Sequence, residues 1–596
     1  MVDVMSAVNT VLSRKYEAVE PSTGRDLRPY TPLLLVIALF LLVALFVRPF
    51  GNYPIDDGAG YGLTIFRLVR EGSLQFPSWA AMTMVTQLAY GTVACLLMGT
   101  SFTALQLSTL VVSIVGIGFV YLLALELGAN KNVASLITAS IALNPIYFAL
   151  SFRFISDTPH FVFLVIGSWL FVRAGRKADW YSTPGITVMS ILAVMSRQCG
   201  ICMPLATLAS NLLRQRITVR SVAVSVLPFV LSLVGLLVFD YWKSHSGQHS
   251  LNYRSLLEIA GHSPSPSLGQ IVSRLVRIPL YCGFFVAPIS LAVFCGYWKN
   301  RRSAFVIIAL AAVAYAAGVC AFIRPMPACS AIFEANGLGP KSFPIELPEI
   351  AVWIRWILTW VCSVSLLSML YESFAHVALR KLEEVRTKPI FTYAIVFGVI
   401  YLASILRLQA FYDKYTLPLA LPGLLLLLIN RPFERMRVSA GWIAAVSIAA
   451  VTCFSAFNYY SYNSACWDLI RLAVRNGVQP EHFNGGFECN LLFSHEPHSA
   501  AVNDWYTWCP QTDATLSVGA DGNSKYARLR GIESPCLFGK PIRVWLCGRW
   551  PANAQVVRSA ETGDARLKQY GIYSSRELSP GSKWLMDADA PQVLTR

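Results

Sequence analysis

The stretch "TPLLLVIALFLLVALFVRPFGNYPIDDGAGYG", Thr31 to Gly62, contains the two features that decide how this chain is interpreted. Its first part is almost entirely apolar and has about the ~20-residue length that an α-helix needs to cross a bilayer. Directly afterwards, two adjacent acids, Asp56 and Asp57, stand among glycines and tyrosines. The first part predicts a membrane span. The second raises the question of why paired carboxylates stand where the chain leaves the membrane.

Apolar runs of similar length recur along the chain. Of its 596 residues, 55% are hydrophobic and 14% are charged, whereas soluble proteins carry roughly 25% charged residues. We therefore predict an all-α polytopic membrane bundle with about thirteen transmembrane helices. The expected spans are 31–49, 105–127, 133–150, 159–172, 185–196, 200–213, 221–241, 280–297, 304–323, 352–371, 390–406, 415–430 and 438–457.

The distribution of basic residues predicts how the bundle is oriented. The chain has 49 basic and 33 acidic residues, a net charge of +16. Most basic residues stand in short loops between spans, as in cytoplasmic loops of membrane proteins, so nucleic acid is not an expected partner. If residues 80–98 crossed the membrane, the basic loops at 173–177 and 214–220 would lie outside. We therefore expect 80–98 to lie along the outer face or dip into it.

This topology predicts three parts of a multi-pass protein of the cytoplasmic (inner) membrane. Residues 1–30 form a cytoplasmic N-terminal segment, and residues 31–457 form the membrane domain with an outer loop at 50–104. Residues 458–596, rich in glycine, serine, proline and tryptophan, form a small mixed α/β domain outside the cytoplasm. Within it, "SACWDLIRLAVRNG" predicts a helix with Ser464 and Gly477 as caps.

Ionisable residues gather at the predicted outer face. Asp157, in "SDTPH", precedes a span as the acid pair follows one. Ionisable groups at membrane edges are costly and usually functional. A carboxylate can take the proton of an attacking hydroxyl, and basic groups suit the phosphate of a lipid-linked substrate. The basic candidates at span ends are Arg153, Arg197, Arg407 and Lys414.

Each of these features also has a structural interpretation. The acid pair could be a solvated turn of Asp and Gly, and Lys414 and Tyr415 could belong to an interfacial belt that anchors a helix. Arg197 could form a structural salt bridge. The role of His160, close to Asp157 in the sequence, is open. No phosphate-binding glycine pattern stands between a strand and a helix, which argues against an ATP-driven pump.

Five motifs follow one another along the chain, and a sixth stretch follows in the tail. The motifs are "IDDGAGYG", "LMGTSFTALQLSTLVVSIVG", "LNPIYFALSFRFISDTPHFVF", "MSRQCGICMPLA" and "FYDKYTLPLALP", with "GGFECN" following in the tail. In this order they resemble one family, the polyprenol-dependent GT-C glycosyltransferases. The chain is most similar to bacterial relatives of the protein O-mannosyltransferases and of the lipid A aminoarabinose transferase. The resemblance covers roughly residues 30–490, and Cys489 departs from the tryptophan of a related "GGFEWN".

The resemblance implies a GT-C-like fold and a transfer reaction. A sugar would move from a polyprenyl-phosphate donor to a lipid, glycan or protein acceptor on the outer face, with inversion. The first-loop acid, Asp57 or Asp56, would be the base, and Asp157 would match the second acidic motif. It leaves open whether a divalent metal (Mg²⁺ or Mn²⁺) takes part. The donor-phosphate candidates are Arg197, Lys414, Arg407 and Arg153, and further site candidates are Tyr61, Gln198, Asp413, Tyr415 and His160.

Other function classes fit the sequence less well. A transporter or flippase of lipid-linked sugars would be expected to show internal repeats and broken helices at mid-membrane, and this chain instead concentrates ionisable groups at one face. A polysaccharide polymerase is a further alternative. A non-catalytic receptor would leave the paired acids unexplained.

Overall fold

The computed structural model describes residues 30–586 with internal gaps. The predicted cytoplasmic segment therefore lies outside the described residues, apart from Tyr30. The gaps are 78–79, 178–181, 214–218, 248–252, 254–265, 330, 340–348, 380–388, 409, 430–431, 477, 479–482, 494–515, 521–527, 538–540, 549–566, 568–571 and 573–581.

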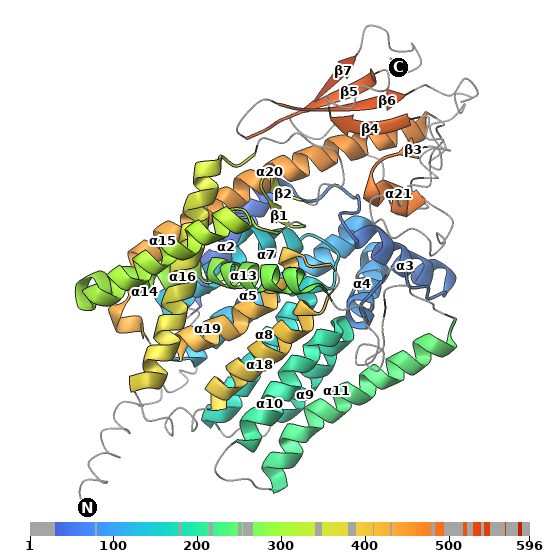
Figure 1. Cartoon of the computed structure of the whole chain (residues 1–596). Coiled ribbons are helices and arrows are strands. Elements are labelled where there is room, and N and C mark those ends of the chain that lie inside the picture. The colour runs from blue at the N-terminus through green and yellow to red at the C-terminus, as the bar shows by residue number, and fades with distance from the viewer. Residues whose placement is uncertain are drawn as a thin grey trace, which may run out of the picture.

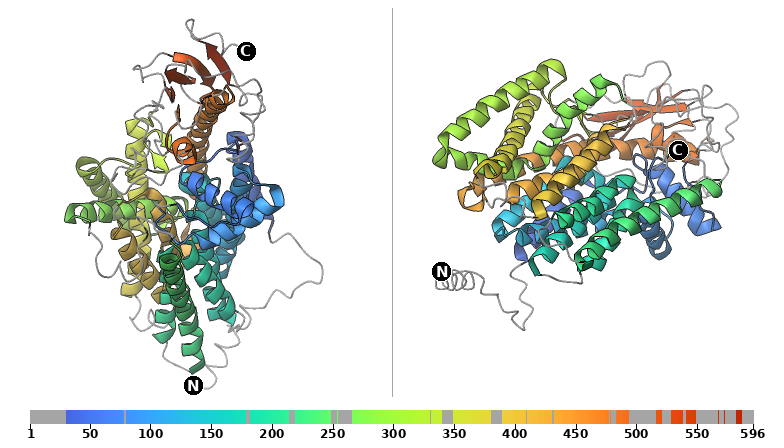
Figure 2. Two further views of the ribbon diagram at one scale, coloured as in Figure 1. Left: turned by 90° about the vertical axis from the view of Figure 1, so that its right-hand side faces the viewer. Right: turned by 60° about the horizontal axis from the view of Figure 1, so that its bottom comes forward.

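The described residues form a helical bundle with a small sheet at one end (Figure 1, Figure 2). The first half of the chain contains α2 (Thr31–Val47), α3 (Gly58–Glu71), α4 (Val85–Met98), α5 (Phe102–Glu126), α6 (Lys131–Ala142), α7 (Pro145–Leu150), α8 (Asp157–Lys177), α9 (Ser182–Ser196), the 3₁₀ helix η1 (Gln198–Ile201), α10 (Cys202–Leu212), α11 (Val219–His245) and α13 (Leu268–Phe285). The second half contains α14 (Ala287–Asn300), α15 (Arg302–Phe322), α16 (Val352–Leu379), α18 (Pro389–Leu406), η2 (Asp413–Leu419), α19 (Ala420–Leu428), η3 (Pro432–Arg435), α20 (Val438–Arg475) and α21 (Phe487–Phe493).

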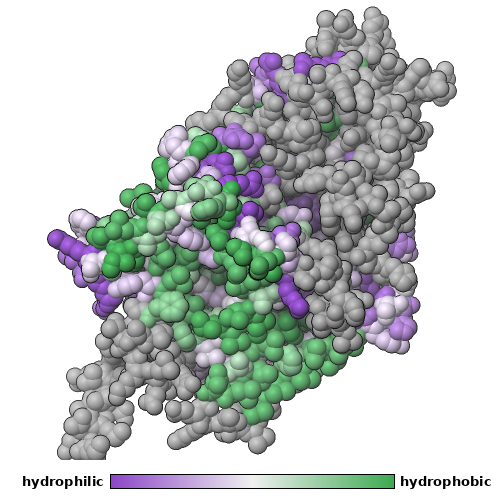
Figure 3. Space-filling view, viewed as in Figure 1, coloured by the Kyte–Doolittle hydropathy of each residue, from purple (hydrophilic) through white to green (hydrophobic). Residues whose placement is uncertain are grey.

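Seven of these helices are long and apolar enough to cross a membrane: α5, α8, α11, α15, α16, α18 and α20. A bent pair, α13 with α14, would make an eighth span. The chain is thus a multi-pass membrane protein. The five other predicted spans coincide with shorter helices (α2, α6 with α7, α9, α10 and α19), so the count of thirteen stays a prediction. Exposed apolar side chains gather over the helices in Figure 3.

Two predicted spans are interrupted in the structure, each for a local reason. The span expected at 133–150 breaks at Asn144, whose side chain accepts a hydrogen bond from the Ile146 N–H and caps α7, while Pro145 occupies the first turn. The span expected at 280–297 bends by 82° between α13 and α14. Pro288 stands at the start of α14, where a helix tolerates a missing N–H.

The predicted first outer loop contains two short helices, α3 and α4. The segment expected to lie along the outer face contains α4, whose 14 residues span roughly 21 Å, too short for the ~30 Å hydrocarbon core. Its position at the outer face stays a prediction. The amphipathic α3 begins immediately after the acid pair. Both helices lie toward the end of the bundle that carries the sheet (Figure 1).

The C-terminal part is joined to the bundle by a single long helix. α20 runs without a break from Val438 to Arg475, through the expected domain boundary at 457/458 and past Ser464, which therefore does not cap a helix. The five-stranded sheet has the order β3-β4-β6-β5-β7, with β3 and β4 parallel and the other pairs antiparallel. Its strands are β3 (Phe483–Asn484), β4 (Leu516–Ala520), β5 (Arg528–Ser534), β6 (Ile542–Gly548) and β7 (Lys583–Met586).

A hairpin from the long outer loop completes the surroundings of the site. Strands β1 (Phe333–Glu334) and β2 (Gly337–Leu338) pair antiparallel, and β2 packs against α20. Gly337 at the turn has a positive φ of 101°, a conformation that L-residues rarely adopt. The backbone of segment 331–339 contacts the side chains of Asp413 and Arg153.

Candidate active site

The acid pair lies at the start of α3 and is largely buried. Asp56 has a left-handed backbone (φ 56°), which Asp tolerates better than most residues. Asp57 directly precedes the first helical residue of α3. Their side chains are 11% and 20% exposed. The interpretation of the pair as a solvated turn is therefore wrong.

Lys414 reaches both carboxylates from the far end of the sequence. Its Nζ lies 3.2 Å from Asp57 Oδ2 and 3.8 Å from Asp56 Oδ2. With only 6% of its side chain exposed, Lys414 does not extend to the membrane interface as an anchoring lysine would. The lysine bridges the two acids and makes a compact charged cluster.

Asp413 holds this lysine in place through the backbone. Its carboxylate accepts hydrogen bonds from the N–H groups of Ile332, Phe333 and Lys414, at 3.0, 2.7 and 2.8 Å. Burial raises the pKa of Asp413 to about 7, while the three N–H donors act in the opposite direction. Asp413 thus joins η2 to the β1–β2 hairpin and makes no direct contact with Asp56 or Asp57 among the described interactions. It is a positioning residue.

Arg153 is the second cation of the cluster. It is fully buried, its Nη1 lies 3.3 Å from Asp56 Oδ2, and its Nη2 donates to the Gly339 carbonyl of the outer hairpin. Its guanidinium also stands over the Tyr459 ring, 4.9 Å from the ring centroid. Asp56 is therefore held by two cations, whereas Asp57 is paired with Lys414.

Asp157 and Arg197 form a second buried ion pair. Asp157 is the first residue of α8, where a carboxylate also interacts favourably with the helix dipole. Arg197 follows the end of α9 and donates to Asp157. Its guanidinium lies over the Tyr415 ring, 4.7 Å from the centroid. The structure therefore contains the salt bridge that the sequence offered as an alternative for Arg197.

Tyr61 lies near both ion pairs. It is fully buried on α3, and its hydroxyl donates to Met82 Sδ at 3.0 Å. Burial raises the pKa of Tyr61 well above its ordinary range; Asp57 and Asp157 add to this rise, and Lys414 and Arg197 oppose it.

The other predicted site residues differ in how they are placed. Gln198 donates to the Ala81 carbonyl in the first outer loop. His160 is buried; its Nδ1 contacts the Ala193 carbonyl, its Nε2 lies 3.5 Å from Cys199 Sγ, and its ring stacks on Tyr401. These contacts pack His160 against the end of α9, Cys199 and Tyr401.

Arg407 is the one donor-phosphate candidate that the structure does not bring to the cluster. It follows the last residue of α18 and is exposed. Among the described residues, no ion pair joins it to the acids. Arg153, Arg197 and Lys414 do converge there.

Electrostatics distinguishes the two first-loop acids. Burial raises the pKa of Asp57 from its ordinary 3.8 to about 6; Lys414 opposes that rise, and the Asp56 carboxylate adds to it. Burial favours the neutral form of Lys414, but Asp57 and Asp56 outweigh it and hold the pKa of the lysine well above its ordinary range. Asp57 is thus a carboxylate with a raised pKa beside a permanent cation.

The residues of this cluster do not make a set of metal ligands. Among the described residues, no group of three or more His, Cys, Asp or Glu side chains is arranged to hold a metal ion. The acids of the site face Lys414, Arg153 and Arg197 instead. The donor set therefore does not fit a divalent metal, and we derive no step through one.

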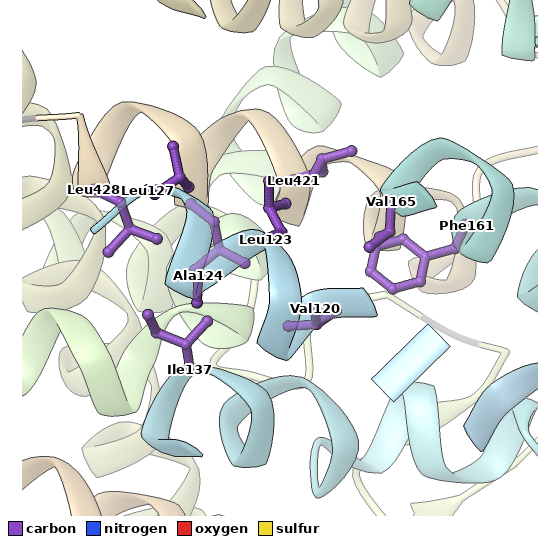
Figure 4. A pocket seen from close by; sticks show the side chains of 10 residues that line it. Val120, Leu123, Ala124, Leu127, Ile137, Phe161, Val165, Leu421 and Leu428 are labelled. Atoms are coloured by element: carbon purple, nitrogen blue, oxygen red, sulfur yellow. The ribbon is translucent and has the colours of Figure 1, made fainter. Parts of the chain in front are cut away.

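An apolar pocket lies between α5, α6, α8 and α19 (Figure 4). Its lining side chains offer no hydrogen-bond partner for a phosphate or a sugar hydroxyl. The lining residues are Val120, Leu123, Ala124, Leu127, Ile137, Phe161, Val165, Leu421, Leu424 and Leu428.

One protein-family model matches part of this chain. Residues 83–242 match the family model "Dolichyl-phosphate-mannose-protein mannosyltransferase". The match includes three of the predicted motifs, and with them Arg153, Asp157 and Arg197. The predicted resemblance to the GT-C glycosyltransferases is thereby confirmed for this part of the chain. No curated protein matches the chain.

Two solved structures are similar in overall arrangement. ArnT from Cupriavidus metallidurans bound to undecaprenyl phosphate has 12% sequence identity and a TM-score of 0.44, covering 87% of this chain and 98% of ArnT. The archaeal oligosaccharyltransferase AglB from Archaeoglobus fulgidus, in complex with an inhibitory peptide and a dolichol-phosphate, has 12% identity and a TM-score of 0.38. That comparison covers 80% of this chain and 62% of AglB.

One residue of the site was not singled out from the sequence. Glu488 on α21 is buried, and its Oε1 accepts a hydrogen bond from the Asp56 N–H at 3.1 Å. It stands within "GGFECN", where Cys489 drew attention as the departure from a related motif. The available signal was an acid two residues after the Gly485-Gly486 pair.

Proposed function

We propose that this protein is a glycosyltransferase that moves a sugar from a polyprenyl-phosphate donor to an acceptor at the outer face of the cytoplasmic membrane. The observation that carries the proposal is the buried cluster in which Lys414 bridges Asp56 and Asp57 beside Arg153. A base and phosphate-binding cations at one membrane edge suit this reaction. The family match over residues 83–242 supports it.

Asp57 is the better candidate for the base. Asp56 Oδ2 is engaged by both Arg153 and Lys414, which restrain it. The Asp57 side chain is the more exposed of the two. Its pKa, raised to about 6 by burial, suits a general base near neutral pH, because such a base works best with a pKa near the operating pH.

The reaction follows a single displacement. The acceptor oxygen attacks the anomeric carbon, the bond from that carbon to the phosphate oxygen breaks, and the polyprenyl phosphate leaves with the bonding electrons. Asp57 takes the acceptor proton. Attack opposite the leaving group inverts the anomeric centre. Lys414 and Arg197, with Arg153 behind, offer the leaving phosphate charge-assisted hydrogen bonds.

The decisive experiment uses the purified full-length protein and radiolabelled undecaprenyl-phosphate sugars, with bacterial lipid, glycan and protein fractions as acceptors. We compare the wild type with Asp57→Asn, Asp56→Asn and Asp157→Asn. Asp57→Asn should lower kcat by about 10²–10⁴-fold, the usual contribution of a general base. Glu533→Gln is the matched control, because its partner Arg543 lies on the distant sheet.

Transfer that is undiminished in all three aspartate variants would overturn the catalytic assignment. Movement of labelled sugar into vesicles without a new glycosidic bond would overturn the proposed function, because it would indicate a transporter. The proposed orientation, with the N-terminus in the cytoplasm, is tested separately by a cysteine at position 177. Labelling of that cysteine from outside intact cells would contradict it.

A further inference from the structure

The first outer loop is held by residues from the far end of the chain. Arg471, near the end of α20, donates to the carbonyls of Gly51 and Asn52. This arginine is itself paired with Asp468 at 3.0 Å, and both side chains are nearly buried. The loop therefore cannot move outward without breaking buried charge-assisted hydrogen bonds.

The next residue of the loop is fixed by the same helix. The Tyr53 hydroxyl lies 3.0 Å from Ser464 Oγ. The Tyr53 ring is stacked on Trp467, with ring centroids 6.0 Å apart and planes 7° from parallel. Such ring pairs are stabilising beyond the area they bury. α20 thus orders the loop just before the acid pair.

Glu488 provides the contact that lies nearest to the acid pair in the sequence of the loop. α21 packs against α3, and the Glu488 carboxylate accepts the hydrogen bond of the Asp56 N–H at 3.1 Å. Gly486, two residues earlier, has φ 84°, which allows the turn that starts α21. Only 1% of Glu488 is exposed, so no solvent competes for this acceptor.

The contact acts on a residue whose backbone conformation is unfavourable. Asp56 has a φ of 56°, in the left-handed region that L-residues other than Gly, Asn and Asp rarely adopt. A conformation of this kind persists only when its surroundings over-determine it. Here the N–H is held by Glu488 and the carboxylate by Arg153 and Lys414. The peptide that follows leads directly into Asp57.

We infer that Glu488 is a positioning residue for the transfer reaction. By fixing the Asp56 N–H, it holds Asp56 in its left-handed conformation and so sets where Asp57 lies relative to Lys414. This inference rests on the proposed function, because it assigns Glu488 a role in orienting the proposed base. It also gives the C-terminal segment a part in the chemistry at the membrane domain.

The inference predicts a specific pattern for two substitutions. Glu488→Ala removes the acceptor and should lower kcat by about 100-fold, the order of loss expected for a ~1 Å displacement of a reacting group, with KM for the donor within about 2-fold. Glu488→Gln keeps a carbonyl oxygen at the same place and should retain kcat within about 3-fold of the wild type. Glu533→Gln is again the unchanged control.

The assay is the radiolabelled transfer reaction, combined with binding of undecaprenyl phosphate followed by tryptophan fluorescence. Both Glu488 variants are expected to bind undecaprenyl phosphate as the wild type does. Wild-type kcat in Glu488→Ala would overturn the inference, and so would a loss in Glu488→Gln as large as that in Glu488→Ala. Equal loss of binding and turnover would overturn it too, since it would mark a binding or folding defect.

The same measurements separate the inference from the function on which it rests. If Asp57→Asn is inactive while Glu488→Ala is fully active, the inference fails and the glycosyltransferase proposal stands. If Asp57→Asn and the wild type transfer sugar equally, the proposed base assignment fails, whatever the Glu488 variants do.

Discussion

Replacement of Lys414 by methionine should move the acid limb of the pH–rate profile to higher pH. Methionine has a similar length and no charge, so the change removes the cation and little volume. Lys414 opposes the burial that raises the pKa of Asp57 to about 6. Without the lysine, the protonated form of Asp57 is favoured further, and a protonated carboxyl cannot act as a base.

The distance between the two groups sets the size of this effect. At the observed 3.2 Å, Coulomb attraction amounts to about 1.3 kcal/mol at the dielectric constant of water and about 5 kcal/mol at an effective value of 20. The smaller figure already corresponds to about one pH unit. The limb of kcat/KM should therefore move from about pH 6 to about pH 7 or higher.

The assay is transfer of labelled sugar between about pH 5 and 9, with kcat/KM fitted at each pH. Asp56→Asn is the matched variant and should shift the pKa of Asp57 in the opposite direction, because the Asp56 carboxylate raises that pKa. The acid limb of Asp56→Asn should lie at a lower pH than that of the wild type. A limb that stays at the same pH in both variants, with the proteins folded, would refute the assignment of Asp57 as the titrating base.

Four further predictions follow from the site. Arg197→Gln should lose about 3–5 kcal/mol of stability, because it leaves Asp157 as an uncompensated buried charge; the melting temperature in detergent should fall, and Asp157→Asn in the same protein should restore part of it. Asp413→Ala should destabilise more than Asp413→Asn, since three backbone N–H groups lose their acceptor at about 1–3 kcal/mol each; an equal melting temperature in the two variants would contradict this. Arg407→Gln should keep transfer within about 2-fold of the wild type, as expected of exposed surface positions, and a large rise in donor KM would restore Arg407 as a phosphate ligand. Undecaprenyl phosphate binding near pH 6.5 should take up protons at Asp57, measured by calorimetry in buffers of different ionisation enthalpy, and uptake that persists in Asp57→Asn would contradict this.

The convergence of these residues could be predicted from the sequence because one physical rule governs it. Basic loops mark the cytoplasmic side, so the acids and cations between them were expected to share the opposite face. Asp56, Asp157 and Lys414 do lie together in one cluster. Arg407 met the same criterion and lies outside the cluster, because standing at a span end does not determine which way a side chain faces.

The pairing of charges could not be predicted in this way. Arg153 is 97 residues from Asp56, and Lys414 is 357 residues from Asp57. Which cation meets which acid depends on how η2 and the 331–339 hairpin fold back over α3. The contact between Glu488 and Asp56 spans 432 residues. Its donor is a backbone N–H, which every residue except proline has, so the sequence cannot indicate it.

The three aspartates of the site face cations before any substrate binds, and this arrangement bears on how the base is made ready. Asp56, Asp57 and Asp157 face Arg153, Arg197 and Lys414. A donor phosphate must therefore compete with carboxylates for these cations. Asp57 is the carboxylate most easily released, because it is the more exposed of the first-loop pair and Asp56 retains Arg153. As the phosphate draws Lys414 away, the attraction that held down the pKa of Asp57 weakens, and the carboxylate becomes a stronger base when an acceptor hydroxyl is to be deprotonated.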